Sequence, residues 1–326
     1  MTTPSGSKSP SQPAPLLKPV PVVHGAGVSI VAPAASVKIE LAKRGMKRLR
    51  ALGFLPQLGN HAFQKGPLYF AGTAAQRLDD LHAAFADQST TMVACLRGGY
   101  GSNYLLEKLD LDLIRNHPKP LLAYSDLTGI QLRLLDRLGL PAFHGPMVAA
   151  DFSVEDGVHL PSFESALAGV PYSVGPAEGL RVLKAGPVLN PVHAVLYGGC
   201  LSILVSLLGT PWEPQTEDKL LFLEDTGAKP YQIDRMLWQL RQAGKLDGVR
   251  GIVFGEMLDC TSPGAPPNLL DEVILRIFED LEFPIAIGLR SGHVTHQNVT
   301  LTFGVEAELH TANQPALNLL EPAVTA

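Results

Sequence analysis

The segment that decides the fold is Pro120-Leu-Leu-Ala-Tyr-Ser-Asp-Leu-Thr-Gly-Ile130, in which a strand pattern changes to a helix pattern at Ser125. Residues 121–124 form a short apolar run typical of a buried strand, and the apolar spacing after them predicts a helix over residues 126–137. A serine at this hinge lies at the carboxyl end of a strand, and the next backbone N–H lies at the positive end of a helix. This arrangement suits a nucleophile beside an oxyanion site. A serine that only caps the helix is the alternative, and capping alone is common in such segments.

Two later segments place other catalytic residue types at the same kind of position. Residues 219–223 form an apolar run that ends on Glu224 and Asp225, and residues 283–289 form another that leads to His293. Active sites of open α/β proteins gather outside the carboxyl ends of strands, so the serine, the carboxylate and the imidazole are expected to converge. The chain order Ser, Glu, His is one that known hydrolases use.

Strand and helix patterns alternate through the first half of the chain. Strands are predicted over residues 28–32 and 91–96, and helices over residues 37–52, 74–86 and 103–109. This alternation and spacing are typical of a doubly wound parallel sheet. In the second half, helices are predicted over 199–209 and 231–243 and strands over 299–303 and 316–320.

The length of 326 residues exceeds what one hydrophobic core usually organises, so two domains are predicted. Residues 1–22 are rich in Pro, Ser and Lys and are predicted to be a disordered tail. Residues 23–150 are assigned to an amino-terminal α/β domain that holds the serine. Residues 151–180 have weak periodicity and are interpreted as a linker, and residues 181–326 as a carboxyl-terminal domain with the glutamate and histidine.

Composition argues against several kinds of partner and location. The net charge is −5 and no long basic run occurs, which argues against nucleic acid and anionic lipid as partners. The three cysteines are far apart and lack metal-type spacing, which is typical of a reducing compartment. Residues 1–20 lack the apolar core of a secretory signal, and no apolar stretch of about 18 residues follows. We therefore expect a protein of the cytoplasm with no membrane span.

The glycine-rich segment Arg97-Gly-Gly-Tyr-Gly101 follows a predicted strand. Its spacing matches neither dinucleotide-binding nor P-loop motifs, so a nucleotide site is disfavoured. Paired glycines let a backbone N–H approach a ligand closely, and the loop is a candidate for the second oxyanion donor. Arg97 is then placed to meet a substrate carboxylate, although an exposed arginine in a tight turn explains the residue equally well.

Two competing sites remain open at this point. Cys200 is a possible thiol nucleophile, but it opens an apolar helix, where a buried structural cysteine is the usual role. His293 and His296 have a spacing that metal sites use, yet no third ligand accompanies them, and a catalytic zinc normally has three.

The chain resembles the LD-carboxypeptidases, also called muramoyl-tetrapeptide carboxypeptidases, over residues 27–304. The resemblance rests on motifs in the family's order: Phe70-Ala-Gly-Thr73 with Arg77-Leu-Asp-Asp80, Arg97-Gly-Gly-Tyr-Gly101, Tyr124-Ser-Asp-Leu-Thr128, His144-Gly-Pro-Met147, Tyr197-Gly-Gly199, Leu208-Gly-Thr-Pro-Trp212, Leu223-Glu-Asp225 and Gly292-His293.

The resemblance implies a flavodoxin-like or class I amidotransferase-like amino-terminal domain with a parallel sheet and a smaller, swivelling β/α carboxyl-terminal domain. It also implies a homodimeric serine peptidase, without metal or cofactor, that removes the terminal D-alanine from cytoplasmic murein tetrapeptides in cell-wall recycling. A microcin-immunity branch of the same family, which hydrolyses aminoacyl or peptidyl nucleotides, is the first alternative. A flavodoxin-like binding module whose serine is only a helix cap is the second.

The family's site residues transfer to this chain by motif. The resemblance implies these roles: nucleophile Ser125, orienting acid Glu224, base His293, oxyanion donors the backbone N–H of Asp126 and of Gly98 or Gly99, and substrate contacts Arg97 and Tyr100. The chain departs from the family at Ala123, where glycine is usual, and at Cys200, where asparagine is usual. The segment after His293 is one residue longer than usual and contains His296.

Overall fold

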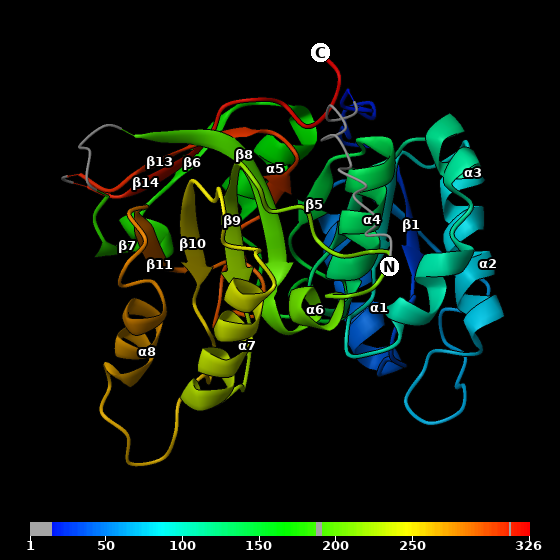
Figure 1. Cartoon of the computed structure of the whole chain (residues 1–326). Helices are drawn as coiled ribbons and strands as arrows, with labels where there is room; N and C mark the ends of the chain where they lie inside the picture. Colours follow the sequence, from blue (N-terminus) through cyan, green and yellow to red (C-terminus); the bar gives the residue numbers. More distant parts are fainter. Residues whose placement is uncertain (1–14, 187–190, 313) are drawn as a thin grey trace, which may run out of the picture.

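A computed structural model describes residues 15–186, 191–312 and 314–326 of the chain. Figure 1 shows two α/β halves side by side. The first is built on a six-stranded sheet in the order β12-β5-β4-β3-β1-β2. Its strands are β1 (Gly27–Val31), β2 (Leu55–Leu58), β3 (Met92–Cys95), β4 (Leu121–Ala123), β5 (Ala142–His144) and β12 (Leu301–Phe303). The first five are parallel in the flavodoxin order 2-1-3-4-5, and β12 adds an antiparallel edge.

Helices cover both faces of this sheet: α1 (Ile39–Ala51), α2 (Ala74–Ala86), α3 (Leu111–Asn116) and α4 (Thr128–Leu138). Alternate residues of β3 point to opposite faces, as the strand period requires. Val93 and Cys95 join a core cluster under α2, α3 and α4, whereas Met92 and Ala94 join the core on the α1 side. None of the described helices has the length and apolar character that a membrane span requires.

Local sequence signals explain where these helices begin and end. Thr73 and Gln76 form a capping box at the start of α2, with each side chain accepting from the other residue's backbone N–H. The α4 helix ends at Gly139, whose φ of +70° is the left-handed conformation that glycine adopts without strain.

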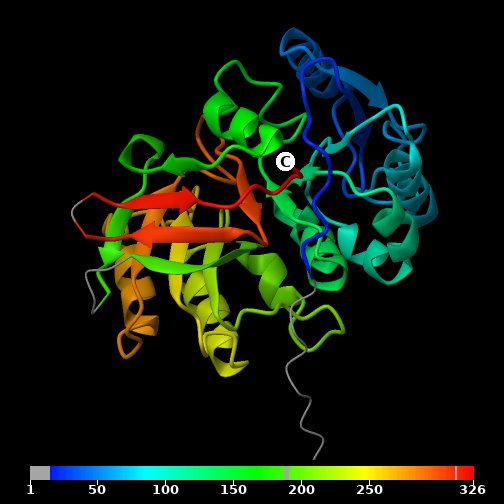
Figure 2. The same cartoon turned by 90° about the horizontal axis from the view of Figure 1, so that it is seen from above.

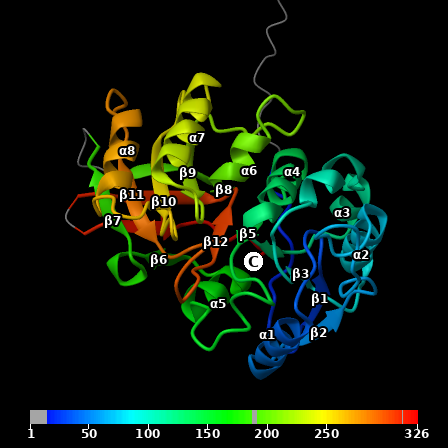
Figure 3. The same cartoon turned by 90° about the horizontal axis from the view of Figure 1, so that it is seen from below.

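The second half is built on an eight-stranded sheet in the order β6-β14-β13-β8-β9-β10-β11-β7. The strands are β6 (Tyr172–Val174), β7 (Arg181–Lys184), β8 (Val192–Cys200), β9 (Lys219–Glu224), β10 (Gly251–Gly255), β11 (Ile285–Leu289), β13 (Glu306–His310) and β14 (Ala316–Leu319). Strands β8 to β11 are parallel, and antiparallel strands flank them on both sides. Figure 3 shows α6 (Leu201–Ser206), α7 (Pro230–Gln242) and α8 (Leu269–Ile277) along one side of this sheet.

The predicted fold class, a parallel-sheet domain followed by a second sheet domain, is confirmed. Two predicted helices differ in extent or type. The helix expected over 199–209 begins only at Leu201, because Gly198 and Gly199 continue β8. A Cβ on Gly198 would lie 2.0 Å from the carbonyl oxygen of Phe222 on the neighbouring strand. The segment expected as a helix over 103–109 is a 3₁₀ helix, η1 (Ser102–Lys108).

The prediction of a disordered tail over residues 1–22 is wrong for residues 15–22, and residues 1–14 lie outside the described residues. The extended segment is held by backbone bonds: Leu17 N donates to Gly139 O at 2.8 Å and Val22 N to Leu167 O at 3.0 Å. Figure 2 shows it beside the C-terminal end of the chain. Proline content predicted disorder, but prolines also suit an extended segment that is fixed by tertiary contacts.

Residues 151–180, interpreted as a linker, contain α5 (Leu160–Ala168) and β6. The buried side chains of α5 include Phe163 and Leu167, and β6 pairs with β14 at the edge of the second sheet. Conversely, β12 lies within the predicted carboxyl-terminal domain but pairs with β5 of the first sheet. A single core cluster contains residues of both sheets, so the two halves share one continuous apolar interior.

Candidate active site

Ser125 lies in a sharp turn between β4 and α4. Its φ is +64°, a conformation that non-glycine residues adopt at a cost of about 1 kcal/mol or more, and nucleophile elbows are a known place for it. Gln131 of α4 fastens the turn by donating from Nε2 to the carbonyl oxygens of Ala123 and Phe143 at 3.0 and 2.9 Å. The N-cap positions of the short 3₁₀ turn at Ser125–Leu127 and of α4 are Tyr124 and Leu127, and within the described part of the chain neither element has a side-chain cap hydrogen bond. The helix-cap alternative for this serine is therefore wrong.

Glu224 and His293 form a close pair at the carboxyl ends of β9 and β11. His293 Nδ1 lies 2.7 Å from Glu224 Oε2, and the His293 backbone N–H donates to the same oxygen at 3.0 Å. Glu224 is 1% exposed, so this pair is shielded from water on the carboxylate side. Because the carboxylate accepts, Nδ1 carries the proton in the neutral imidazole, and Nε2 then has a free lone pair.

Two glycines make room for this buried carboxylate. A Cβ on Gly292 would lie 2.6 Å from Glu224 Cδ, and a Cβ on Gly255 would lie 2.7 Å from Glu224 Cβ. Gly292 also has a φ of +89°. Glycine immediately before His293 is thus required both by the backbone and by the carboxylate under it.

The two partners shift each other's ionisation. Burial lowers the pKa of His293, but the charge of Glu224 and its hydrogen bond raise it more, so the pKa lies above its ordinary value. Burial raises the pKa of Glu224, but the charge and hydrogen bonds of His293 lower it more, so its pKa lies below its ordinary value. The pair favours a carboxylate beside an imidazole that holds a proton strongly.

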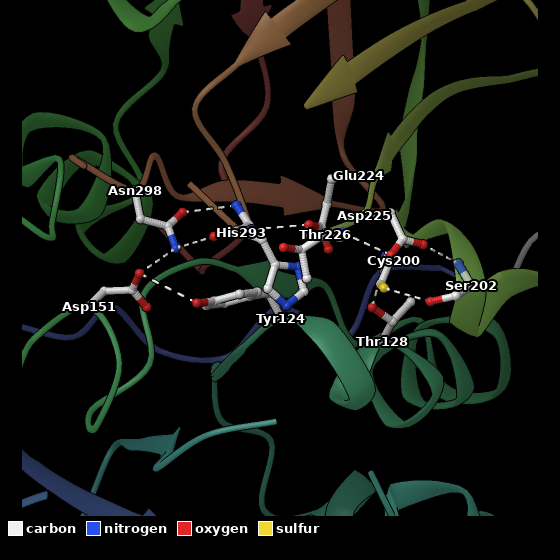
Figure 4. A network of polar contacts seen from close by, with 11 residues as sticks. Tyr124, Thr128, Asp151, Cys200, Ser202, Glu224, Asp225, Thr226, His293 and Asn298 are labelled. Carbon is white, nitrogen blue, oxygen red and sulfur yellow. Dashed lines mark hydrogen bonds and ion pairs between the residues drawn. The ribbon is translucent and has the colours of Figure 1, made fainter. Parts of the chain in front are cut away.

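Tyr124 connects the serine turn to this pair. It directly precedes Ser125, and its ring meets the His293 ring edge-on with centroids 5.1 Å apart and an interplanar angle of 84°. Figure 4 shows His293 between Tyr124 and Glu224. The segment that carries Ser125 therefore contacts the Glu224–His293 pair through Tyr124, and among the described residues no hydrogen bond joins Ser125 to His293.

The glycine-rich loop lies against the serine. A Cβ on Gly98 would be 3.0 Å from Ser125 Oγ and 3.3 Å from Asp126 N, so this glycine leaves open the space beside the serine. Asp126 ties the loop to the turn, because its Oδ2 accepts from the Ser102 N–H at 2.8 Å. Arg77 supports the loop from below by donating from Nη1 to the Gly101 carbonyl at 2.7 Å.

Two hollows flank this loop, and Tyr100 lines both. One is a cavity of about 180 Å³ between the halves, walled by Asp126, Leu106 and side chains of the second half such as Trp212. The other, of about 360 Å³, is more open and contains Arg97. Both Arg97 and Tyr100 are exposed, and within the described parts of the chain no acidic side chain pairs with Arg97.

The competing catalytic residues have other surroundings. Cys200 is buried, and burial together with the charges of Glu224 and Asp225 raises the pKa of its thiol well above the ordinary value, which disfavours a thiolate nucleophile. His296 is exposed and its Nδ1 contacts Thr295 Oγ1. Asp225 turns away from the histidine and accepts from the backbone N–H of Ser202 at the start of α6. Among the described residues, no cluster of three or more His, Cys, Asp or Glu side chains is arranged to hold a metal ion.

Sequence reasoning gave no role to three buried polar residues beside the pair. Asp151 and Asn298 are hydrogen bonded to each other next to Tyr124 (Figure 4). His144 at the end of β5 is fully buried among Phe222, Phe303 and Tyr124, and burial lowers its pKa to about 4. A buried Asn or Asp in a loop carries no periodicity signal, so only the motif around His144 could have drawn attention to this region.

Comparison with known proteins agrees with this geometry. Residues 28–145 match the family model of the LD-carboxypeptidase N-terminal domain, and residues 193–309 match that of the LD-carboxypeptidase C-terminal domain. The chain belongs to the LD-carboxypeptidase family. It is 34% identical over 304 residues to a probable murein peptide carboxypeptidase of Bacillus subtilis, covering 92% of this chain and 93% of that protein.

Solved structures of LD-carboxypeptidase relatives share the whole fold. The muramoyltetrapeptide carboxypeptidase of Oxalobacter formigenes is 28% identical with a TM-score of 0.80, covering 92% of this chain and 100% of that one. An MccF-like protein of Bacillus anthracis is 27% identical with a TM-score of 0.84, covering 93% of this chain and 99% of that one. The resemblance to this family is confirmed, and the chain is a peptidase of the carboxypeptidase class.

Proposed function

We propose that this LD-carboxypeptidase is a serine peptidase that removes the terminal D-alanine from murein tetrapeptides in the cytoplasm. The observation that carries the proposal is the buried Glu224–His293 pair beside a serine held at a φ of +64°. The names of the Bacillus and Oxalobacter relatives support a murein peptide as substrate. The three cysteines are all buried and free, which accords with a reducing compartment.

The reaction follows from the proposed roles. Ser125 Oγ attacks the carbonyl carbon of the bond to D-alanine while its proton moves to Nε2 of His293. The backbone N–H groups of Asp126 and of Gly98 or Gly99 stabilise the oxyanion. When the C–N bond breaks, His293 returns the proton to the amine of D-alanine, and water then releases the acyl group by the same steps. Glu224 keeps the imidazole in the required tautomer and stabilises its cation.

The direct test compares two substrate classes with the purified chain. The expected activity is release of D-alanine from a murein tetrapeptide, and chromatography of the products measures it. An aminoacyl sulfamoyl-adenosine serves as the competing substrate, because the fold is shared with an MccF-like protein. Faster hydrolysis of the nucleotide would replace the murein proposal with the microcin-immunity alternative. The homodimer expected from the family stays a prediction, which sedimentation equilibrium would decide.

Replacing Glu224 with glutamine is expected to lower kcat less than loss of the serine and to leave KM nearly unchanged, because this carboxylate does not touch substrate.

His293 acts as a base only when neutral, so kcat/KM should rise with pH through a midpoint above about 6.5. Glu224→Gln removes the anion that raises this pKa, so the midpoint should move to lower pH. A pH profile of kcat/KM for the wild type and for Glu224→Gln measures the midpoint and its shift. If Asp225→Asn shows the loss of kcat expected for Glu224→Gln, and Glu224→Gln itself shows none, Asp225 is the acid that orients His293.

Arg97 is proposed to bind the free carboxylate of the departing D-alanine through a bidentate, charge-assisted contact. Arg97→Ala should lose most of the discrimination between a free and an amidated C-terminus, and Arg97→Lys should lose part of it. The measurement is the ratio of kcat/KM for tetrapeptide over its C-terminal amide. Arg290 is the alternative cation, and its Nη2 donates to the Ala177 carbonyl at 2.6 Å. An unchanged ratio in the Arg97 variants would make Arg97 structural, and a changed ratio in Arg290→Ala would assign the C-terminal carboxylate to Arg290.

A further inference from the structure

Asn298 is a fully buried amide that holds the turn carrying His293. Its Oδ1 accepts from the Gly292 N–H at 3.0 Å, and its Nδ2 donates to the Gly292 carbonyl at 2.9 Å. The second hydrogen of Nδ2 points to Asp151 Oδ1 at 3.1 Å. Both amide hydrogens and the carbonyl oxygen are thus used, and no other side chain of this size supplies the same set of donors and acceptor.

Asp151 carries the connection to the nucleophile's side of the molecule. Its Oδ2 accepts from the Met147 N–H at 2.7 Å, which fixes the carboxylate just after β5. Its Oδ1, which accepts from Asn298, also lies 3.5 Å from the hydroxyl of Tyr124. Tyr124 directly precedes Ser125 and packs against the ring of His293. One carboxylate oxygen therefore joins the two segments that carry the nucleophile and the base.

These contacts cross between chain segments that are otherwise distant. Asp151 and Asn298 are 147 residues apart in the chain, and Tyr124 and Asp151 are 27 apart. The backbone around Asn298 is fixed as well, since Asn298 N donates to Gly157 O at 2.9 Å and His159 N donates to Asn298 O at 3.1 Å. On the opposite side, Gly292 packs closely under Glu224. The His293 turn is thereby held from two directions, by Glu224 on one side and by Asn298 on the other (Figure 4).

We propose that Tyr124, Asp151 and Asn298 form a positioning bridge that sets the separation between Ser125 and His293. The proposal rests on the serine mechanism given above. None of the three residues transfers a proton or contacts the reacting atoms. They act through Gly292 and the Tyr124 ring, which fix the base relative to the serine. A misplacement of about 1 Å in a catalytic group costs roughly a hundredfold in rate, so such a bridge has a measurable effect on turnover.

The first test replaces Asn298 with aspartate, which has the same shape, keeps an acceptor for the Gly292 N–H and removes both donors. We expect kcat to fall about a hundredfold with KM within about twofold of wild type, and labelling of Ser125 by a serine-directed phosphonate to slow in parallel. The double variant Asn298→Asp with Asp151→Asn restores a donor between positions 151 and 298. It should recover at least about fivefold of the lost kcat, which a residue needed only for folding would not do.

The second test removes only the hydroxyl in Tyr124→Phe, where about a fivefold loss of kcat is expected because its contact with Asp151 is long. Tyr197→Phe is the matched control. Tyr197 is a buried tyrosine of β8 whose hydroxyl donates to Asp136 Oδ2 of α4 at 3.0 Å and accepts from the Gln215 N–H at 3.1 Å, and none of these residues belongs to the His293 turn. Tyr197→Phe should lower the melting temperature about as much as Tyr124→Phe does and leave kcat unchanged. This pair decides the question even if the Asn298 variants do not fold.

The proposal is overturned if Asn298→Asp and Tyr124→Phe keep wild-type kcat, or if Tyr197→Phe loses as much kcat as Tyr124→Phe. It is also overturned if the Asp151, Asn298 double variant shows no recovery. Failure of the serine mechanism has a different signature, since Ser125→Ala would then keep activity and the phosphonate would not label the wild-type protein.

Discussion

Replacing Ser125 with alanine is expected to abolish D-alanine release, with kcat lower by roughly 10⁴ or more, while the protein stays folded. The loss is large because the members of a triad act as a unit, and without the serine oxygen no acyl-enzyme forms. The backbone at this position should tolerate alanine, since serine already has a Cβ at a φ of +64°. Activity and melting temperature measured on the same sample separate catalysis from folding.

Ser29→Ala is the matched control for this substitution. Ser29 is a buried serine of β1 in the same sheet, and its Oγ contacts Thr90 Oγ1 at 2.8 Å. It should keep wild-type turnover and still be labelled by a serine-directed phosphonate, whereas Ser125→Ala should lose the label. A Ser125→Ala protein that retains a tenth of wild-type turnover would show that Ser125 is not the nucleophile.

Removal of the imidazole in His293→Ala is expected to be as damaging as loss of Ser125, because the serine hydroxyl then has no base. His296→Ala should keep nearly all activity. The two histidines differ in the structure: His293 is paired with a buried carboxylate at 2.7 Å, whereas His296 is exposed and its Nδ1 lies 3.0 Å from Thr295 Oγ1. The kcat values of the two variants, measured under identical conditions, give the comparison.

The reverse ranking would move the base to His296. Equal, small losses in both variants would contradict a histidine base altogether. Both residues lie in one short loop, so a general disturbance of that loop would lower kcat equally in the two variants. Loss of the base would lower it only in one of them, and the same two kcat values distinguish these cases.

Much of the fold followed from local pattern. The apolar run before Ser125 and the helical spacing after it identified β4 and α4, and the helical pattern over residues 74–86 identified α2. These signals are local, because strand and helix periods depend on residues a few positions apart. Two of the differences between prediction and structure arise where tertiary contacts override composition. The proline-rich residues 15–22 are fixed by bonds to Gly139 and Leu167, and the short α5 is held by burial of Phe163.

For the candidate site, the sequence by itself determined the residue types and their places after strands, together with the family. It left open whether Ser125 caps a helix, which of Glu224 and Asp225 faces the histidine, and which histidine is paired. Tertiary structure decided these points. The positive φ of Ser125, the 2.7 Å contact of Glu224 with His293, and the turn of Asp225 toward α6 all depend on packing between distant segments.

The Asp151–Asn298 contact was beyond sequence reasoning for the same physical reason. It joins residues 147 positions apart, and neither residue belongs to a periodic pattern. Local sequence specifies which backbone conformations a segment prefers, and those preferences placed the catalytic residue types at strand ends. The direction in which a buried polar side chain points is decided instead by the partners available to it once the two sheets share a core, because a buried polar group without a partner is costly.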